Sequence, residues 1–364
     1  MKPFTPYILP PKDINWERHI TFIGLANAEL ARYDGVLQHI PNTEILFSPL
    51  TTQEAVLSSK IEGTQATLED VLSFEAKKES ANPKSEDIGE VINYRKTLEH
   101  AVNRIGKYDF PLSLRLIKEM HEILLDNVRG QNKDRGNFRR SQNWIGAPGS
   151  TMETARYVPP TPADVMPALD NFEKYIHYIE KDRLVQLAVI HAQFEMIHPF
   201  LDGNGRIGRL LIPLFLFEKK VLCKPLFYIS AYFESNREEY YNRLLSVSQT
   251  NDWDSWIEYF LNVVILQARK NVQYANSILS LYNEMKTRVV ELTNSKHAIE
   301  TIDFIFRKPI FTTSNFLEET NIPRPGAKRI LSRLANEVLN VLEPGVGSKP
   351  AKYSFNKLLE ITKA

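Results

Sequence analysis

Apolar residues recur along most of the chain at intervals of three and four, which is the spacing of one face of an α-helix. Residues 184–197 and 253–264 show this period most clearly. Alternation at every second residue, which is typical of a half-buried strand, is confined to short pieces. The pattern therefore predicts a mainly α fold.

Two stretches interrupt the helical period. Residues 75–90 are charged and weakly apolar, so we expect a solvated loop there. Residues 130–162 are rich in glycine and proline and contain short β-prone pieces at 143–145 and 156–158. This second stretch predicts a hairpin or flap between helical blocks.

Residues 295–364 differ from the rest in charge and pattern. They carry 11 Lys+Arg against 7 Asp+Glu, a net charge of +4 in a chain whose total is +1. The order of elements expected there is that of a winged helix-turn-helix. These elements are helices over 297–306, 313–320 and 327–336, then strands over 338–342 and 353–355 around a GVGSKP wing.

Basic residues follow one face of the last of these helices. Arg324, Lys328, Arg329 and Arg333 lie at near-helical spacing with no acidic residue among them. Such a face would contact nucleic acid. The alternative is a solvated face on a protein-interaction module.

Composition narrows the class of protein without giving its chemistry. The 364 residues carry 45 Lys+Arg against 44 Asp+Glu, so any charged binding surface must be local. Cys223 is the one cysteine, which excludes an intramolecular disulfide and a cysteine metal cage. The most apolar run, residues 210–217, is far shorter than the roughly 20 residues of a membrane span. With no signal-peptide pattern at the N-terminus, we expect a cytoplasmic protein without a membrane segment.

The residues with the clearest chemistry are 197–211, IHPFLDGNGRIGRLL. Gly203 and Gly205 lie between two apolar helices and permit positive φ, so neighbouring backbone N–H groups can converge on an anion. The N-terminus of the following helix adds its own unpaired N–H groups. Arg206 and Arg209, three residues apart, place two guanidinium groups on one helix face. The segment is therefore suited to a polyphosphate.

Three other motifs match this segment in part. GNGRIG matches the dinucleotide fingerprint, but the residues before it have a helical period and not a strand. An EF-hand loop would need glycine and glutamate where Ile207 and Pro213 stand. His191, Glu195 and His198 share one helix face and could bind a metal ion, although a hydrogen-bonded core histidine at 191 is the simpler interpretation.

Residues 198–209, HPFLDGNGRIGR, resemble the Fic (filamentation induced by cAMP) family signature H-P-F-x-[DE]-G-N-G-R-x-x-R at every specified position. The resemblance extends over about 110–265. It implies a protein adenylyltransferase that moves AMP from ATP to a Tyr, Ser or Thr hydroxyl of a target protein and of itself. The roles it implies are a general base near the ordinary pKa of about 6.5 for His198, an Mg²⁺ ligand for Asp202, a phosphate cradle for Gly203, Asn204 and Gly205, and β- and γ-phosphate contacts for Arg206 and Arg209.

The resemblance also assigns two elements outside the signature. A flap that aligns the target segment by strand addition is implied for Asn143, Trp144, Ile145 and Gly146. A plain structural hairpin is the alternative. Tyr240 and Tyr241 resemble a tyrosine pair near the nucleotide base, and aromatic residues at this spacing can equally be core.

Residues 58–63, SSKIEG, match the inhibitory motif [ST]-x-x-x-E-[GN] of the same family through Ser58, Glu62 and Gly63. We expect an inhibitory helix over about 51–63, started by Thr51 and stopped by Gly63. Glu62 would then be an acid at a helix C-terminus, which is unfavourable unless a cation compensates. The resemblance proposes Arg209 as that cation, so that Glu62 inhibits ATP binding.

The expected domains are 1–108 (N-terminal helical), 109–265 (catalytic core), 266–294 (linker helix) and 295–364 (winged helix). Two alternatives remain: a DNA-binding regulator that senses nucleotide, and an enzyme that also removes AMP. The identity of the target and the presence of a homodimer are left open.

Overall fold

The computed structural model describes residues 2–77, 84–147, 149–347 and 349–363, and within them the fold is mainly α, as predicted. The helices are α1 (Trp16–His39), α2 (Thr43–Leu46), α3 (Ser48–Ile61), α4 (Leu68–Lys77), α5 (Ser85–Tyr108), α6 (Leu114–Leu124), α7 (Pro162–Ile176), α8 (Arg183–Ile197), α9 (Asn204–Glu218), α10 (Ser230–Ser235), α11 (Arg237–Thr250), α12 (Trp253–Thr293), α13 (Ala298–Arg307), α14 (Thr313–Glu319), α15 (Arg324–Leu334) and α16 (Asn356–Lys363). The strands are β1 (Ile310–Thr312), β2 (Asn340–Glu343) and β3 (Lys352–Ser354).

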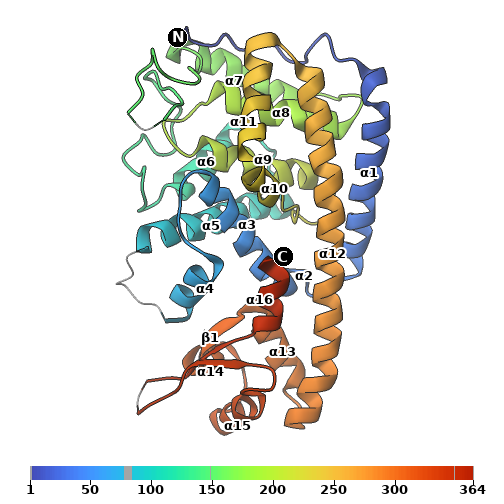
Figure 1. The fold of residues 1–364 in the computed structure, drawn as a ribbon, viewed down its shortest axis with the longest axis vertical. Coiled ribbons are helices and arrows are strands. Elements are labelled where there is room, and N and C mark those ends of the chain that lie inside the picture. The colour runs from blue at the N-terminus through green and yellow to red at the C-terminus, as the bar shows by residue number, and fades with distance from the viewer. Residues whose placement is uncertain (1, 78–83, 148, 348, 364) are drawn as a thin grey trace.

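The long helix α12 runs almost the full height of the molecule, with α1 packed along its upper part (Figure 1). Its first turn is capped by Asp252, whose carboxylate accepts from the N–H of Ser255. Because α12 is continuous over 41 residues, the boundary expected between residues 265 and 266 falls inside one helix. The linker is therefore an extension of a core helix.

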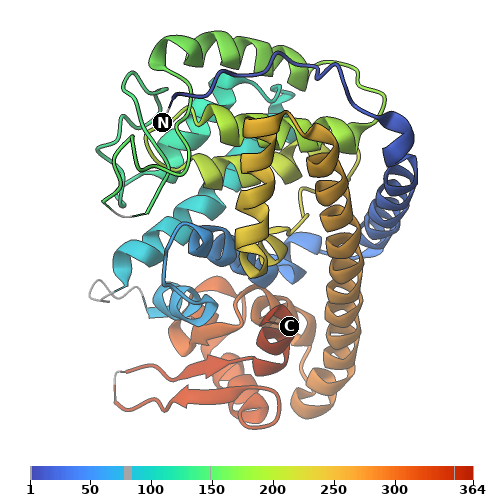
Figure 2. The ribbon, with the colours of Figure 1, turned by 45° about the horizontal axis from the view of Figure 1, so that its top comes forward.

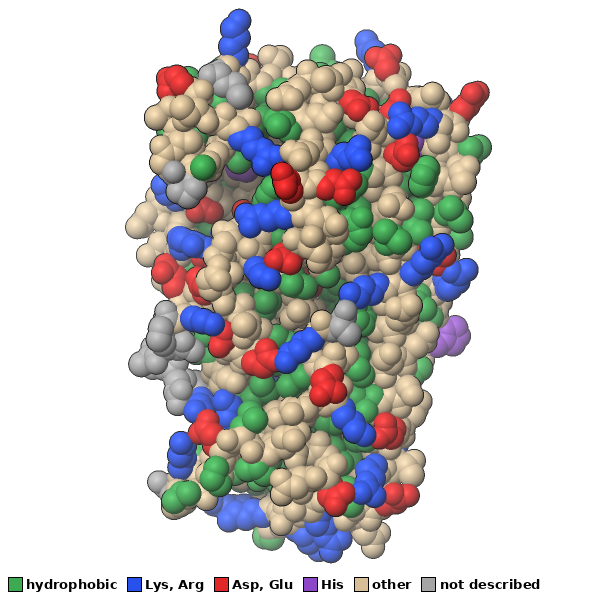
Figure 3. All heavy atoms as spheres, viewed as in Figure 1, with side chains coloured by type: hydrophobic (Ala, Val, Ile, Leu, Met, Phe, Trp, Pro, Cys, Tyr) green, Lys and Arg blue, Asp and Glu red, His purple; other side chains and the backbone are tan. Residues whose placement is uncertain are grey.

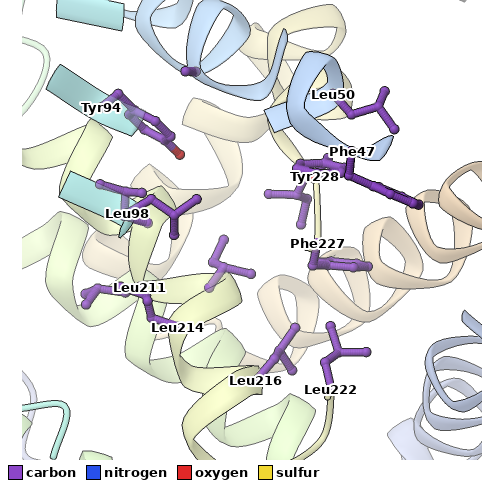
Figure 4. Close-up of a cluster of buried hydrophobic side chains, with 14 of the residues drawn as sticks. Phe47, Leu50, Tyr94, Leu98, Leu211, Leu214, Leu216, Leu222, Phe227 and Tyr228 are labelled. Atoms are coloured by element: carbon purple, nitrogen blue, oxygen red, sulfur yellow. The ribbon is translucent and has the colours of Figure 1, made fainter. Parts of the chain in front are cut away.

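Helices α8 and α9 lie at the centre of the fold. Thirteen of the 15 residues in each are buried, which is typical of a helix surrounded on all sides. Leu211 and Leu214 of α9 pack in one apolar cluster with Leu50 of α3 and Tyr94 and Leu98 of α5 (Figure 4). The same core thus fixes the inhibitory-motif helix α3 against α9.

The helix expected over 51–63 starts earlier than the sequence indicated. It begins at Ser48 with Pro49 in its first turn, and the hydroxyl of Thr51 donates to the carbonyl of Phe47 and does not cap the helix. It ends as predicted: Glu62 is the C-cap, and Gly63 follows with φ 100°.

The prediction of a solvated loop over 75–90 is wrong at both ends of that range. Residues 75–77 belong to α4, and α5 begins at Ser85 and buries Ile88 and Glu90 completely. Residues 78–83 lie outside the described part of the chain. The charged composition does not predict burial at Glu90, because the partners of this carboxylate lie far away in the sequence.

The C-terminal block has the predicted order of helices and strands, with bounds shifted by up to three residues. Two elements were not predicted, strand β1 and helix α16. The three strands form an antiparallel sheet of order β1-β3-β2, and the β2–β3 hairpin projects from the lower end of the molecule (Figure 2). Residue 348, in the expected wing, is not described. Helices α13 and α16 contact α3, and β1 contacts α4.

Among the described residues, none of the helices is both long and apolar enough to cross a membrane.

Candidate active site

His198 closes helix α8 and begins the loop that leads into α9. Its backbone is left-handed (φ 48°), and its N–H donates to the carbonyl of Phe194 at 3.0 Å. Ring Nδ1 lies 3.3 Å from the carbonyl oxygen of Glu195, which can only accept, so Nδ1 carries the proton and Nε2 keeps its lone pair. Burial lowers the pKa of His198 to about 4, more than the Glu195 carbonyl and the Glu62 carboxylate raise it. The ring is thus a neutral base at pH 7, with a pKa below the expected 6.5.

The loop between α8 and α9 is held closed by Asn204. Its Oδ1 accepts from the N–H of Phe200 at 2.8 Å, and its Nδ2 donates to the Phe200 carbonyl at 2.9 Å. Asn143 of the expected flap donates to the same carbonyl at 3.0 Å. Gly203 is the N-cap of α9 with φ 76°, a conformation that favours glycine. The side chain of Asn204 therefore shapes the loop, and the backbone N–H groups of the first turn of α9 are left to bind an anion.

Gly205 lies in the first turn of α9 with a negative φ, so the conformational freedom that glycine permits is used at Gly203 and not here. The lack of a Cβ at Gly205 instead gives room to two side chains. A Cβ at this position would overlap Oε1 of Glu62 and lie 2.9 Å from Nη1 of Arg209. The Glu62 carboxylate therefore lies directly against the turn that the sequence assigns to phosphate.

Glu62 and Arg209 form the expected ion pair, with Nη2 and Oε1 2.8 Å apart. Arg209 is 1% exposed and also donates from Nε to Oγ of Ser58 and from Nη2 to the Ser58 carbonyl, both at 2.8 Å. Burial would raise the pKa of Glu62, but the charge and hydrogen bond of Arg209 outweigh it and hold that pKa below its usual value. Both groups are charged at pH 7.

Arg206 faces two carboxylates. Its Nη1 lies 3.0 Å from Oε2 of Glu90 on α5, and its Nη2 lies 3.3 Å from Oδ1 of Asp202. Glu90 is completely buried and also binds Arg129 at 3.0 Å and the hydroxyl of Thr64 at 3.0 Å. Nε of Arg206 is buried without a partner among the described residues. Nε of Arg206 is therefore a donor that no described residue uses. Glu90 is a site residue that the sequence did not reveal.

Asp202 fits the magnesium role as a single ligand. Its Oδ1 accepts from the N–H of Gly203 at 2.6 Å and from Arg206, and its side chain is 35% exposed. A Cβ on Gly130 would lie 2.8 Å from Oδ2, so the absence of a side chain at residue 130 leaves space beside that oxygen. Among the described residues there is no group of three or more His, Cys, Asp or Glu that could hold a metal ion. An Mg²⁺ ion here would share one carboxylate with phosphate oxygens and water.

The three-residue metal site weighed for α8 is not formed. His191 is a core histidine: Nδ1 lies 3.1 Å from the Gly208 carbonyl and Nε2 2.9 Å from the Tyr240 hydroxyl. Burial lowers the pKa of His191 to about 3. Oε1 of Glu195 is buried without a partner in the described structure, and burial raises the pKa of Glu195 to about 7.

The two tyrosines of the expected nucleotide-base site differ in exposure. Tyr240 is fully buried and stacks on Phe233 at 4.3 Å, so it is part of the core. Tyr241 is partly buried, with its ring 5.3 Å from Tyr240 and the Arg237 guanidinium 5.6 Å above it. Tyr241 is the better placed of the pair to offer a ring face to a base.

One pair of residues joins the two sides of the expected flap by backbone hydrogen bonds. Ile145 and Tyr157 form an isolated antiparallel bridge, with the Ile145 N–H donating at 2.8 Å to the Tyr157 carbonyl. No longer strand forms in the part of the flap that the structure describes. Trp144 and Ile145 are 44% and 37% exposed, and Gly146 lies close to Ser150 and Ala155. The flap therefore presents apolar side chains beside the loop that carries His198.

His121 of α6 supports this loop and was not found from the sequence. Its ring stacks on Phe200 at 3.7 Å, Nε2 donates to the Asp202 carbonyl at 3.0 Å, and Nδ1 accepts from the N–H of Gly136 at 2.9 Å. Burial lowers the pKa of His121 to about 4, more than the Asp202 carbonyl raises it. Only the neutral ring can make both bonds.

Comparison with known families gives two adjacent matches. A family model described as "Fic/DOC family N-terminal" matches residues 20–103, and one described as "Fic/DOC family" matches residues 111–216.

Among curated relatives, protein adenylyltransferase Fic of Drosophila grimshawi is 33% identical over 104 residues, which is 28% of this chain and 19% of that protein. The same-named protein of Aedes aegypti is 33% identical over 111 residues, 30% of this chain and 20% of that protein. The chain thus matches about a fifth of the length of these relatives.

Two solved structures share the fold. A Fic family protein from Desulfovibrio desulfuricans G20 has a TM-score of 0.61 and 19% identity, with 98% of each chain covered. A Fic domain containing signaling protein from Bacteroides thetaiotaomicron has a TM-score of 0.54 and 19% identity, with 69% of this chain and 97% of that chain covered.

Proposed function

The chain belongs to the Fic/DOC family, since the two matched segments together span more than half of it, and on that premise we propose that it is a protein adenylyltransferase. It moves AMP from ATP to a hydroxyl of a target protein and of itself. The observation that carries the proposal is the hydrogen bond from Nδ1 of His198 to the Glu195 carbonyl, which leaves Nε2 unprotonated on the residue that ends α8 and begins the loop to α9.

In the proposed reaction, Nε2 of His198 accepts the proton of the target hydroxyl as its oxygen forms a bond to the α-phosphorus. The bond from that phosphorus to the bridging oxygen breaks, and pyrophosphate leaves with the electron pair. The backbone N–H groups that open α9 oppose the negative charge that develops on the α-phosphate.

The remaining phosphates are assigned to the side chains around this turn. Nε of Arg206 is the buried donor left for a phosphate oxygen, and Arg209 would bind the γ-phosphate once it is free. Asp202 would hold Mg²⁺ through its outer carboxylate oxygen. The metal ion, when bound, would neutralise charge on the phosphates.

Glu62 restrains this activity in the proposed mechanism. Its carboxylate occupies the space over Gly205 and binds the guanidinium that the γ-phosphate needs. ATP would therefore bind poorly or in an unproductive pose until α3 moves. A further role for Glu62, activation of water to remove AMP from a modified target, is tested by whether Glu62→Gly loses release of label from a labelled target.

The position of the label in ATP tests the reaction class. With the Glu62→Gly variant, α-³²P-ATP should label protein and γ-³²P-ATP should not. Transfer from γ-labelled ATP would show a phosphotransferase instead. His198→Ala in the same background should abolish labelling and leave affinity for a fluorescent ATP analogue within about threefold of the parent variant.

We further propose that residues 295–364 form a winged helix-turn-helix that contacts duplex nucleic acid. Lys and Arg side chains gather at the lower end of the molecule, where α15 lies (Figure 3). Arg324, Lys328 and Arg329 are exposed, and none of them forms an ion pair with another described residue. Arg333, expected on the same face, instead donates to the Leu292 carbonyl at 3.1 Å.

Salt-dependent binding of a fluorescent duplex tests this second proposal. Reversing Arg324, Lys328 and Arg329 to Glu should abolish binding, whereas the control Lys12→Glu, at an exposed residue of the N-terminal segment, should not change it. Equal binding by both variants would contradict a role for α15.

A further inference from the structure

Arg139 is a buried cation whose contacts in the described structure are all backbone carbonyls. It is 2% exposed. Nε donates to the His198 carbonyl at 2.9 Å, Nη2 to the carbonyls of Pro160 at 2.6 Å and Ile197 at 3.3 Å, and Nη1 to that of Ser141 at 3.3 Å. Burial lowers the pKa of Arg139 to about 10, so the group stays charged at pH 7. Burying a charge without a counter-charge is costly, so these contacts need an explanation.

Two of these carbonyls flank His198. The carbonyl of Ile197 belongs to the peptide plane before His198, and the carbonyl of His198 belongs to the plane after it. Since φ and ψ are the rotations between these two planes, one guanidinium that binds both carbonyls fixes the backbone of His198. The backbone N–H of Arg139 adds a bond to the Pro199 carbonyl at 2.9 Å. This matters because a left-handed conformation is unfavourable for a residue with a Cβ.

The other two carbonyls belong to the ends of the flap. Ser141 enters the segment that contains the Ile145–Tyr157 bridge, and Pro160 leaves it. The flap and the backbone of His198 are thus held by the same side chain. Movement of one relative to the other would break hydrogen bonds to a buried charge, which are stronger than neutral ones.

We propose that Arg139 is a positioning residue that sets the position of His198 relative to a target segment docked on the flap. This inference rests on the proposed AMP transfer. Burial is the main cause of the low pKa of His198, and the charge of Arg139 adds a smaller effect in the same direction, whereas the Glu195 carbonyl and the carboxylates of Glu62 and Asp202 raise that pKa. Arg139 therefore holds the ring in place and adds to the effect of burial on its protonation.

The test compares Arg139→Met and Arg139→Lys with the matched control Arg140→Met, all in the Glu62→Gly background. Arg140 is the exposed neighbour on the same segment. Arg139→Met should lower the rate of α-³²P incorporation by about 100-fold, because misplacement of a catalytic group by an ångström has an effect of this size. Affinity for a fluorescent ATP analogue should stay within threefold, and the acid limb of the pH–rate profile should move to higher pH. Arg139→Lys keeps the charge, so its acid limb should not move although its rate falls.

Hydrogen exchange gives a readout that does not depend on activity. Amides of residues 139–160 and 197–200 should exchange faster in Arg139→Met than in Arg140→Met. Unchanged exchange and a control-like rate would overturn the inference, as would equal losses of transfer and nucleotide affinity, which indicate a general structural role. If the Glu62→Gly parent itself transfers no label, the proposed function fails, and the exchange comparison alone decides whether Arg139 holds the loop and the flap.

Discussion

The hydrogen bonds of Arg209 within the described structure come from Nε and Nη2, and all of them go to the segment that restrains it. Its hydrogen bonds go to the hydroxyl and carbonyl of Ser58 and to the carboxylate of Glu62, one turn apart on α3. Nε and Nη2 of this buried cation can bind a phosphate only if that segment moves. Ser58 and Glu62, the two ends of the motif in the sequence, are therefore parts of one clamp.

Ser58→Ala should loosen the clamp without removing its charge pair. The lost hydrogen bond to a charged group should weaken the restrained state by about 1.5 kcal/mol. Label transfer from α-³²P-ATP should therefore be about tenfold faster in Ser58→Ala than in the unchanged chain. Ser59→Ala is the matched control, because the Ser59 hydroxyl is buried without a partner among the described residues. Equal rates for the two variants would show that the Ser58 hydroxyl does not contribute.

His121 should make the fold sensitive to acid. Its pKa is about 4 in the folded chain and about 6.5 when unfolded, so protonation favours the unfolded state and stability is lost as pH falls from 6.5 towards 4. The loss of unfolding free energy between pH 7 and pH 5, measured in urea, should be about 2 kcal/mol smaller in His121→Gln than in the parent. The same loss in both chains would mean that His121 does not titrate in this range.

At the scale of elements, local signals were predictable and distant partners were not. The end of α8 and the stop of α3 follow from Pro199 and Gly63, which act on their own backbone. The charge pattern places Glu90 in a loop, because its partner Arg206 is 116 residues away and leaves no local signal. The described part of the expected flap contains only one β-bridge. Strand β1 is three residues long and fully buried, which is too short to show an alternation of apolar and polar residues in the sequence. The signature residues were found, but the roles of Asn204 and Gly205 depend on Phe200 and Glu62 beside them.

Glu90→Gln should destabilise the junction between α5 and α9. It removes the negative charge from a carboxylate that faces the buried Arg206 and the half-exposed Arg129, which predicts a loss of about 3 kcal/mol in unfolding free energy. Glu86→Gln, one turn earlier on α5 and exposed, should stay within about 0.5 kcal/mol of the parent. Urea unfolding of both variants measures the difference. A loss below 1 kcal/mol for Glu90→Gln would contradict the structural role given to this carboxylate.

At the scale of the whole molecule, one buried apolar cluster runs from Leu9 to Leu358 and includes residues of α12 along most of its length. A second cluster joins Leu68, Leu72 and Ala76 of α4 to Ile310 of β1 and Leu359 of α16. The C-terminal block is thus packed onto α4, which follows Glu62 in the sequence, and onto α3, which ends at Glu62. We infer that the described parts of the chain unfold as one unit.

Calorimetry of Leu359→Ala tests this inference. Truncation of a buried leucine should cost about 3 kcal/mol and lower the temperature of a single transition. Leu342→Ala on β2, where the side chain is 47% exposed, is the control and should leave the transition nearly unchanged. Two separate transitions in the parent chain would contradict a single cooperative unit.

Restraint of AMP transfer by Glu62 is tested most directly by the initial rate of α-³²P incorporation into protein, with the unchanged chain and Glu62→Gly compared at the same ATP concentration. Loss of the carboxylate frees Arg209 and the turn at Gly205, so the rate should rise at least tenfold, and His198→Ala in the same background should return it to zero. Equal rates for the unchanged chain and Glu62→Gly, or labelling that persists without His198, would contradict the proposed mechanism.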